Sequence, residues 1–83
     1  MEPESYKRFV ATAVRTRVLE LRRQGVRTSK GEKMSLAAIA RTLDPPVSRI
    51  SVYLVVDGKS ESKRIKEAVE RELRQPFWIR RAG

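Results

Sequence analysis

The sequence predicts an all-α fold of four helices, or five if the C-terminal end forms a short turn of its own. Apolar residues recur at the three- and four-residue spacing of a helical face in four stretches. Serine or acidic residues stand where these stretches begin, and glycine or proline follows where they end. With 83 residues, we expect a single domain over residues 1–83, near the lower limit for burying a self-sufficient core. A chain of this size often gains stability from a partner subunit.

The first helix is expected over residues 4–24. Acidic residues around Pro3 suit the positive end of the helix dipole, and Arg22 and Arg23 suit its negative end. Gly25 ends the helix. Its predicted buried stripe consists of Tyr6, Phe9, Val10, Ala13, Val14, Val18 and Leu21. Because about 20 residues span about 30 Å, the far end either reaches a second subunit or packs on the chain's own core.

Residues 25–34 are predicted to form a loop, since glycines and polar residues dominate them. Arg27, Lys30 and Lys33 make this loop basic. Two interpretations stay open: the cations brace the phosphates of a nucleic acid, or they are simply solvated.

Two short helices joined by a tight turn are expected over residues 35–57. Ser35 and Ser48 are placed to cap them, because a serine hydroxyl accepts backbone N–H groups that otherwise lack a partner. The prolines of 44–46 stop the first helix, and Gly58 follows the second. The first apolar face is Leu36, Ile39, Ala40 and Leu43, and the second is Val52, Val55 and Val56. The small Ala40 lies where two such helices approach closely, as in a helix-turn-helix.

Residues 35–64 also carry a resemblance. S-L-A-A-I-A-R-T-L, followed by V-S-R-I-S-V-Y-L-V-V-D-G-K-S, resembles the helix-turn-helix of phage and bacterial regulators of the Ner-like and lambda-repressor-like type. The resemblance implies a repressor that occupies an operator. That family usually joins the helices with a single glycine before the valine, whereas Asp44-Pro45-Pro46 makes the connection about two residues longer here, which affects the angle between the helices. The alternative is a pair of core helices without a DNA role.

A fourth helix is expected over residues 60–75. Ser60 or Ser62 caps it, and Gln75-Pro76 ends it. Its predicted buried face is Ile65, Ala68, Val69 and Leu73. The cluster 77–79 (Phe-Trp-Ile) either closes the core or forms an exposed dimer patch. Residues 80–83 form a basic tail.

The charge balance points to a polyanionic partner. The chain has 19 Lys and Arg against 10 Asp and Glu, a net charge of +9, which favours nucleic acid first and an anionic membrane surface second. Lack of cysteine favours a reducing cytoplasm, and a DNA partner would associate the protein with the nucleoid there. With no histidine either, most zinc sites are excluded. No apolar run approaches the roughly 20 residues of a membrane span.

Catalysis is not expected. The chain has no His, no Cys, no Gly-rich phosphate loop and no paired carboxylates in a credible pocket. Its acidic residues are scattered among arginines, where we expect solvated ion pairs. We therefore predict neither a cofactor nor a small-molecule substrate.

The second helix of the pair, residues 48–57, is the predicted recognition helix. Its candidate base-reading residues are Ser48, Arg49, Ser51 and Tyr53. Arg49 is the strongest candidate, because a guanidinium pairs bidentately with guanine O6 and N7. The serines suit base edges or phosphates, and Tyr53 suits a phosphate or a thymine methyl group. Ile50 and Leu54 either touch thymine methyls or pack internally.

Phosphate contacts are expected at the capped helix start at residue 35 and at the start of the fourth helix. The candidates are Ser35, Lys59, Ser60, Lys63 and Arg64. The alternative for Lys63 and Arg64 is pairing with Glu67 or other neighbours on a solvated face.

The sequence therefore predicts a sequence-specific regulator that binds double-stranded DNA as a homodimer. Two other classes stay open: a basic nucleoid or RNA-binding protein without sequence preference, and a protein-interaction module that engages its partner through the long first helix.

Overall fold

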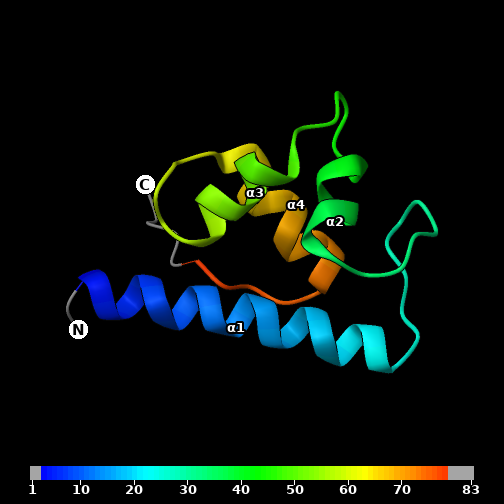
Figure 1. Cartoon of the computed structure of the whole chain (residues 1–83), viewed down its shortest axis with the longest axis horizontal. Coiled ribbons are helices and arrows are strands. Elements are labelled where there is room, and N and C mark those ends of the chain that lie inside the picture. Colours follow the sequence, from blue (N-terminus) through cyan, green and yellow to red (C-terminus); the bar gives the residue numbers. More distant parts are fainter. Residues whose placement is uncertain (1–2, 79–83) are drawn as a thin grey trace.

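A computed structural model describes residues 3–78, with side chains from residue 5 onward. This part of the chain forms four α-helices and no strand (Figure 1). The helices are α1 (Pro3–Arg23), α2 (Leu36–Thr42), α3 (Arg49–Val56) and α4 (Lys63–Leu73). The predicted all-helical class and all four helices are confirmed. Residues 74–78 form no fifth helix, and the predicted contribution of Ile79 and the basic tail lies outside the described residues.

Serine hydroxyls cap three of the helices, as the sequence predicts. Ser35 Oγ accepts from the N–H of Ala38, and Ser48 Oγ accepts from the N–H of Ser51. At α4 the capping residue is Ser62 rather than Ser60. The fourth helix therefore begins at Lys63, three residues later than expected.

α1, α3 and α4 are followed by a residue in left-handed backbone, which glycine adopts without a steric penalty, whereas α2 ends at Leu43 in extended backbone. Gly58 follows α3 with φ of +75°. The end of α4 differs, because Arg74 occupies this conformation with φ of +56°. Arg74 is the one non-glycine residue of the described chain with positive φ.

The core lies between α1 and the other three helices. α2 packs on α3 and α4, while the long α1 lies across α3 and α4 (Figure 1). The buried apolar residues of the helices are Val10, Val14, Val18, Leu21, Leu36, Ala38, Ile39, Ala40, Val52, Val55, Val56, Ile65, Ala68, Val69 and Leu73. All three predicted inner valines of α3 and all four apolar residues of α4 are among them.

The predicted buried stripe of α1 is too wide. Val10, Val14, Val18 and Leu21 are buried, but Phe9 is 63% exposed. Helical spacing placed Phe9 at the edge of the stripe, and no element of the described chain covers that side of α1.

The expectation that all acidic residues are solvated is wrong for Glu70 and Glu72, which are 9% and 6% exposed. Glu72 accepts hydrogen bonds from Ser29 N–H and Ser29 Oγ, both at 2.7 Å. Glu70 accepts from the N–H groups of Phe77 and Trp78, at 2.7 and 3.1 Å. These two carboxylates tie the loop 25–34 and the C-terminal segment to α4.

Phe77 and Trp78 are half-buried and pack against the core. Their rings meet edge to face with centroids 6.1 Å apart. Lys66 Nζ lies 5.7 Å from the centre of the Trp78 ring, within the range of a cation–π contact. This packing favours closure of the core over an exposed dimer patch.

None of the helices in the described chain has the length and apolar character needed to cross a membrane.

Candidate nucleic-acid interface

The connection between α2 and α3 runs over residues 43–48, so the expectation of a tight turn is wrong. Its greater length agrees with the about two extra residues of Asp44-Pro45-Pro46 noted in the sequence. Val47 N–H donates to Ala40 O at 3.2 Å, which holds the connection on α2. Arg64 Nη2 donates to Pro45 O at 2.6 Å, which holds it on α4. The connection is therefore braced from both sides, and α3 has a fixed position.

The outer side of α3 presents Arg49, Ile50 and Leu54. Arg49 is exposed and makes no hydrogen bond or ion pair with a described residue. Ile50 is 54% exposed and Leu54 is 39% exposed. Of the two interpretations left open for these apolar residues, internal packing does not hold for Ile50 and holds only in part for Leu54.

The other predicted base-reading residues lie on the flanks of α3. Ser48 and Ser51 bond to each other through their hydroxyls at 3.1 Å, and Ser48 Oγ also caps the helix. Tyr53 is half-buried against the core and lines a hollow of about 360 Å³. The hollow is completed by Arg15, Val18, Leu19, Ser35 and Leu36. Tyr53 therefore lies on the flank of α3 that is nearest α1.

An ion pair fixes the C-terminal end of α3 on α1. Arg15 donates to both carboxylate oxygens of Asp57, at 2.8 and 3.4 Å. Both side chains are partly exposed, so the pair serves position more than stability.

The predicted phosphate-binding residues fall into two groups. Lys59 and Ser60 lie in the segment between α3 and α4, Lys63 is the first residue of α4, and all three are exposed. Lys63 lies 3.9 Å from Glu67 while staying 87% exposed, so that alternative pairing is loose. Arg64 pairs with Pro45 O instead of Glu67. The fifth residue, Ser35, is half-buried at the start of α2, away from this group.

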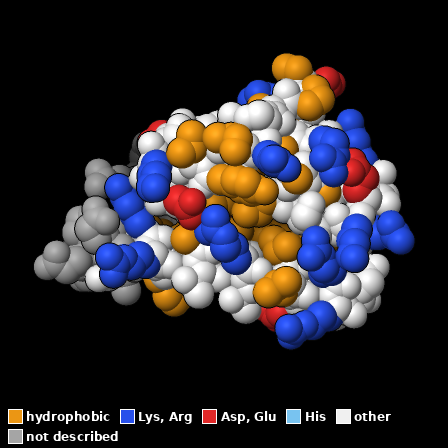
Figure 2. Space-filling model, viewed as in Figure 1, with side chains coloured by type: hydrophobic (Ala, Val, Ile, Leu, Met, Phe, Trp, Pro, Cys, Tyr) orange, Lys and Arg blue, Asp and Glu red, His pale blue; other side chains and the backbone are white. Residues whose placement is uncertain are grey.

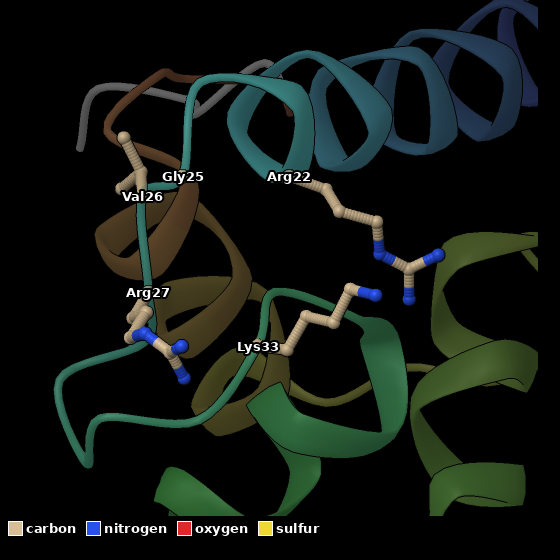
Figure 3. A pocket seen from close by; sticks show the side chains of 5 residues that line it. All are labelled: Arg22, Gly25, Val26, Arg27 and Lys33. Atoms are coloured by element: carbon tan, nitrogen blue, oxygen red, sulfur yellow. The ribbon is translucent and has the colours of Figure 1, made fainter.

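A basic hollow that includes a residue missed by the sequence analysis lies at the end of α1. Arg22, Arg27 and Lys33 line it, together with Gly25 and Val26, and its volume is about 250 Å³ (Figure 3). The sequence marks Arg27 and Lys33 as part of a basic loop, but nothing in the pattern of α1 connects Arg22 to them.

Positive charge surrounds the face shown in Figure 2, where Lys and Arg side chains ring a central group of apolar side chains. Several carboxylates are paired locally. A hydrogen bond from Arg41 lowers the pKa of Glu32, and a hydrogen bond from Lys66 lowers the pKa of Glu61. Both acids therefore stay ionised and are neutralised by those partners.

No group of three or more metal-ligating His, Cys, Asp or Glu side chains occurs among residues whose side chains the structure describes.

Comparison with the models of known protein families, with curated proteins and with solved structures finds no match for this chain.

Proposed function

We propose that this protein is a sequence-specific regulator that binds double-stranded DNA through a helix-turn-helix formed by α2 and α3. The observation that carries the proposal is the outer side of α3, where Arg49 is exposed and has no partner among the described residues, beside the exposed Ile50 and Leu54. A helix with its side chains is about 10–12 Å across, which fits the B-DNA major groove of about 12 Å. The net charge of +9 supports a polyanionic partner.

In this proposal Arg49 recognises a guanine through O6 and N7. Ile50 and Leu54 contact thymine methyl groups. Ser48 and Ser51 keep acceptor and donor capacity for a base edge or a phosphate beyond their mutual bond. Tyr53, on the flank, contacts the backbone beside the groove.

Lys59, Ser60 and Lys63 are proposed to hold one strand's phosphates at the start of α4, with Arg64 and Ser35 as further contacts. Because Arg64 also braces the α2–α3 connection, it acts on the position of α3 as well as on a phosphate. The resemblance favours repression by occupying the operator.

We also propose that the protein binds as a homodimer, with half-sites about one helical turn apart. The exposed Phe9 on α1 supports a contact there, since aromatic side chains supply much of the burial at interfaces. In sedimentation experiments Phe9→Ser is expected to shift the protein from dimer to monomer. The matched variant Thr12→Ser, also on the exposed surface of α1, is expected to stay dimeric. If Phe9→Ser forms a dimer with an unchanged dimerisation constant, the contact between the two subunits does not involve Phe9.

The test of the function is selection from a pool of random duplex DNA at about 150 mM salt, where non-specific binding is weak. We expect a recovered motif with two related halves. Tight binding at low salt without any recovered motif would refute sequence-specific recognition and favour an architectural or RNA-binding protein.

Arg49→Ala tests direct readout on the selected site. We expect a loss of about 1–3 kcal/mol in binding and relaxed preference at one base position. The control Lys63→Ala removes a proposed phosphate contact, so it should weaken binding to all sequences alike. If Arg49→Ala also weakens all sequences equally, Arg49 does not read a base.

The exposure of Ile50 and Leu54 also supports a second candidate, a module that places α3 against a protein partner. Failure to bind any duplex in the selection would favour this candidate.

A further inference from the structure

The loop between α1 and α2 is folded back on itself, which brings two cations together. An isolated antiparallel bridge pairs Arg27 with Lys33, and Gly31, with φ of +81°, makes the turn between them. The bridge places the backbones of the two basic residues opposite each other, and in Figure 3 the Lys33 side chain runs toward α1 while the Arg27 side chain runs along the loop. The sequence alone gives no sign that these two residues are opposite each other.

A third cation joins the pair from α1. The ends of the Arg22 and Lys33 side chains point toward one another in Figure 3. Arg22 Nε donates to Met34 O at 3.1 Å, which leaves both terminal nitrogens available. Arg27 donates to Gly31 O through its terminal nitrogen Nη1, which leaves its second terminal nitrogen available.

Nearby acidic groups do not neutralise these three cations. Glu32 pairs with Arg41 at 2.7 Å, Glu20 lies 4.0 Å from Arg17, and Glu72 is engaged by Ser29 and Arg71. Within the described chain, Arg22, Arg27 and Lys33 have no ion-pair partner. Arg22 and Lys33 point toward one another, while Arg27 lies on the rim of the same hollow with its guanidinium turned toward the loop (Figure 3). These uncompensated cations create a site that an anion would stabilise.

The loop is held rigidly enough to keep this arrangement without a ligand. Thr28 is buried, its N–H donates to Glu32 O at 2.9 Å and its carbonyl accepts from Gly31 N–H at 2.8 Å. Ser29 is held on Glu72 by two hydrogen bonds of 2.7 Å. The backbone that carries Arg27 and Lys33 is therefore positioned in advance, which lowers the entropy cost of binding.

The basic hollow also adjoins the hollow beside Tyr53. On α1, Arg15 and Leu19 line the hollow beside Tyr53, and Arg22, one turn further along, lines the basic hollow. At the start of α2, Ser35 lines the first and Lys33 the second. A strand passing the Tyr53 flank of α3 would thus reach the three cations next.

We infer that Arg22, Arg27 and Lys33 bind a backbone phosphate of the DNA, outside the part of the site contacted by α3 and the start of α4. This inference rests on the proposed function. The ligand chemistry is a phosphodiester oxyanion, which two guanidinium groups and an ammonium group bind through charge-assisted hydrogen bonds.

The test compares two double variants that remove the same charge from the same elements. Arg22→Gln/Lys33→Gln removes two cations of the hollow. Arg23→Gln/Lys30→Gln removes two exposed cations that do not line it. Affinity for one duplex is measured by fluorescence anisotropy between 50 and 200 mM salt, after circular dichroism has verified folding. Lys33→Gln alone is measured as well, because Lys33 has no side-chain bond in the described structure whose loss would affect folding.

Each protomer of the proposed homodimer loses one neutralised phosphate, so the magnitude of the negative slope of log K against log salt should fall by about 1.8. Over this fourfold salt range, the affinity advantage of wild type over the hollow variant should shrink about 12-fold. The control variant should keep the wild-type slope, and Lys33→Gln should fall between them. Equal slopes for the two double variants, with wild type still binding DNA, would overturn this inference and leave the proposed function intact. No duplex binding by wild type would overturn both.

Discussion

Replacing Glu72 by glutamine tests how the basic loop is held on the helical core. The Glu72 side chain is 3% exposed and accepts from Ser29 N–H, Ser29 Oγ and Arg71 Nε, the last at 3.3 Å. A glutamine keeps one acceptor oxygen and turns an NH₂ group toward one of these donors. Hydrogen bonds to a charged group contribute about 1.5–3 kcal/mol, and glutamine removes the charge of the acceptor, so we expect Glu72→Gln to lower the free energy of unfolding by about 2 kcal/mol.

That loss is large for this chain but compatible with folding. Stabilities of about 0.05–0.15 kcal/mol per residue give about 4–12 kcal/mol for 83 residues. For a domain of this size 1 kcal/mol shifts the melting temperature by about 4–8 °C. Glu72→Gln should therefore lower it by about 8–16 °C, which is measurable by circular dichroism and by urea unfolding followed through Trp78 fluorescence.

The same variant makes a pH prediction. Burial alone raises the pKa of Glu72, but the hydrogen bonds from Ser29 and Arg71 outweigh burial and hold the pKa below its ordinary value. With a folded-state pKa lower than the unfolded one, the stabilisation is complete above the unfolded value of about 4.3. It is lost as pH falls through the lowered folded-state pKa. The gap in unfolding free energy between wild type and Glu72→Gln should therefore be largest near pH 7 and close in acid.

Glu67→Gln is the matched control, since Glu67 is on the same helix but 48% exposed. It should change the free energy of unfolding by less than about 0.5 kcal/mol. Equal stabilities of Glu72→Gln and Glu67→Gln at pH 7 would refute the reasoning. A gap that stays constant in acid would refute the role of the charge.

Two further predictions concern backbone conformation, and both are checked by urea unfolding. Gly58→Ala should destabilise the protein by at least about 1 kcal/mol, because φ is +75° and the added Cβ would lie 2.7 Å from Lys7 Cδ. The control Gly25→Ala should cost less, because Gly25 has a similar φ of +76° but nothing within 4 Å of the added Cβ. Equal losses of stability would show that the Lys7 contact does not matter. Arg74→Gly should stabilise the protein by about 0.5–1 kcal/mol, since glycine relieves the left-handed cap; a loss of stability would mean that the Arg74 side chain contributes more than its backbone costs.

Local sequence signals predicted the elements well because their physical causes are local. Ser35 and Ser48 cap helices through hydrogen bonds that span three residues. The inner valines of α3 follow from helical spacing. The burial of Met34 also has a local cause. An apolar residue directly before a helix cap often packs against the residue five positions further along, which here is the equally buried Ile39.

The rest depends on residues far apart in the chain. Glu72 is buried because Ser29, 43 residues away, supplies two donors, and no local pattern marks this. Arg64 donates a hydrogen bond to Pro45 O, 19 residues away in the chain. Arg64 therefore holds the α2–α3 connection in addition to being a candidate phosphate contact. The prediction that Phe9 is buried was wrong for the opposite reason. Helical spacing allowed Phe9 on the buried stripe, but no neighbouring element of the described chain covers it.

We propose that the outer side of α3 contacts DNA. The most direct measurement is a titration of ¹⁵N-labelled protein with a duplex, following each backbone amide by NMR. We expect the largest chemical-shift changes in α3, from Arg49 to Leu54, with further changes around Lys59–Lys63. Changes confined to α1 around Phe9, or no saturable change with any duplex, would contradict it.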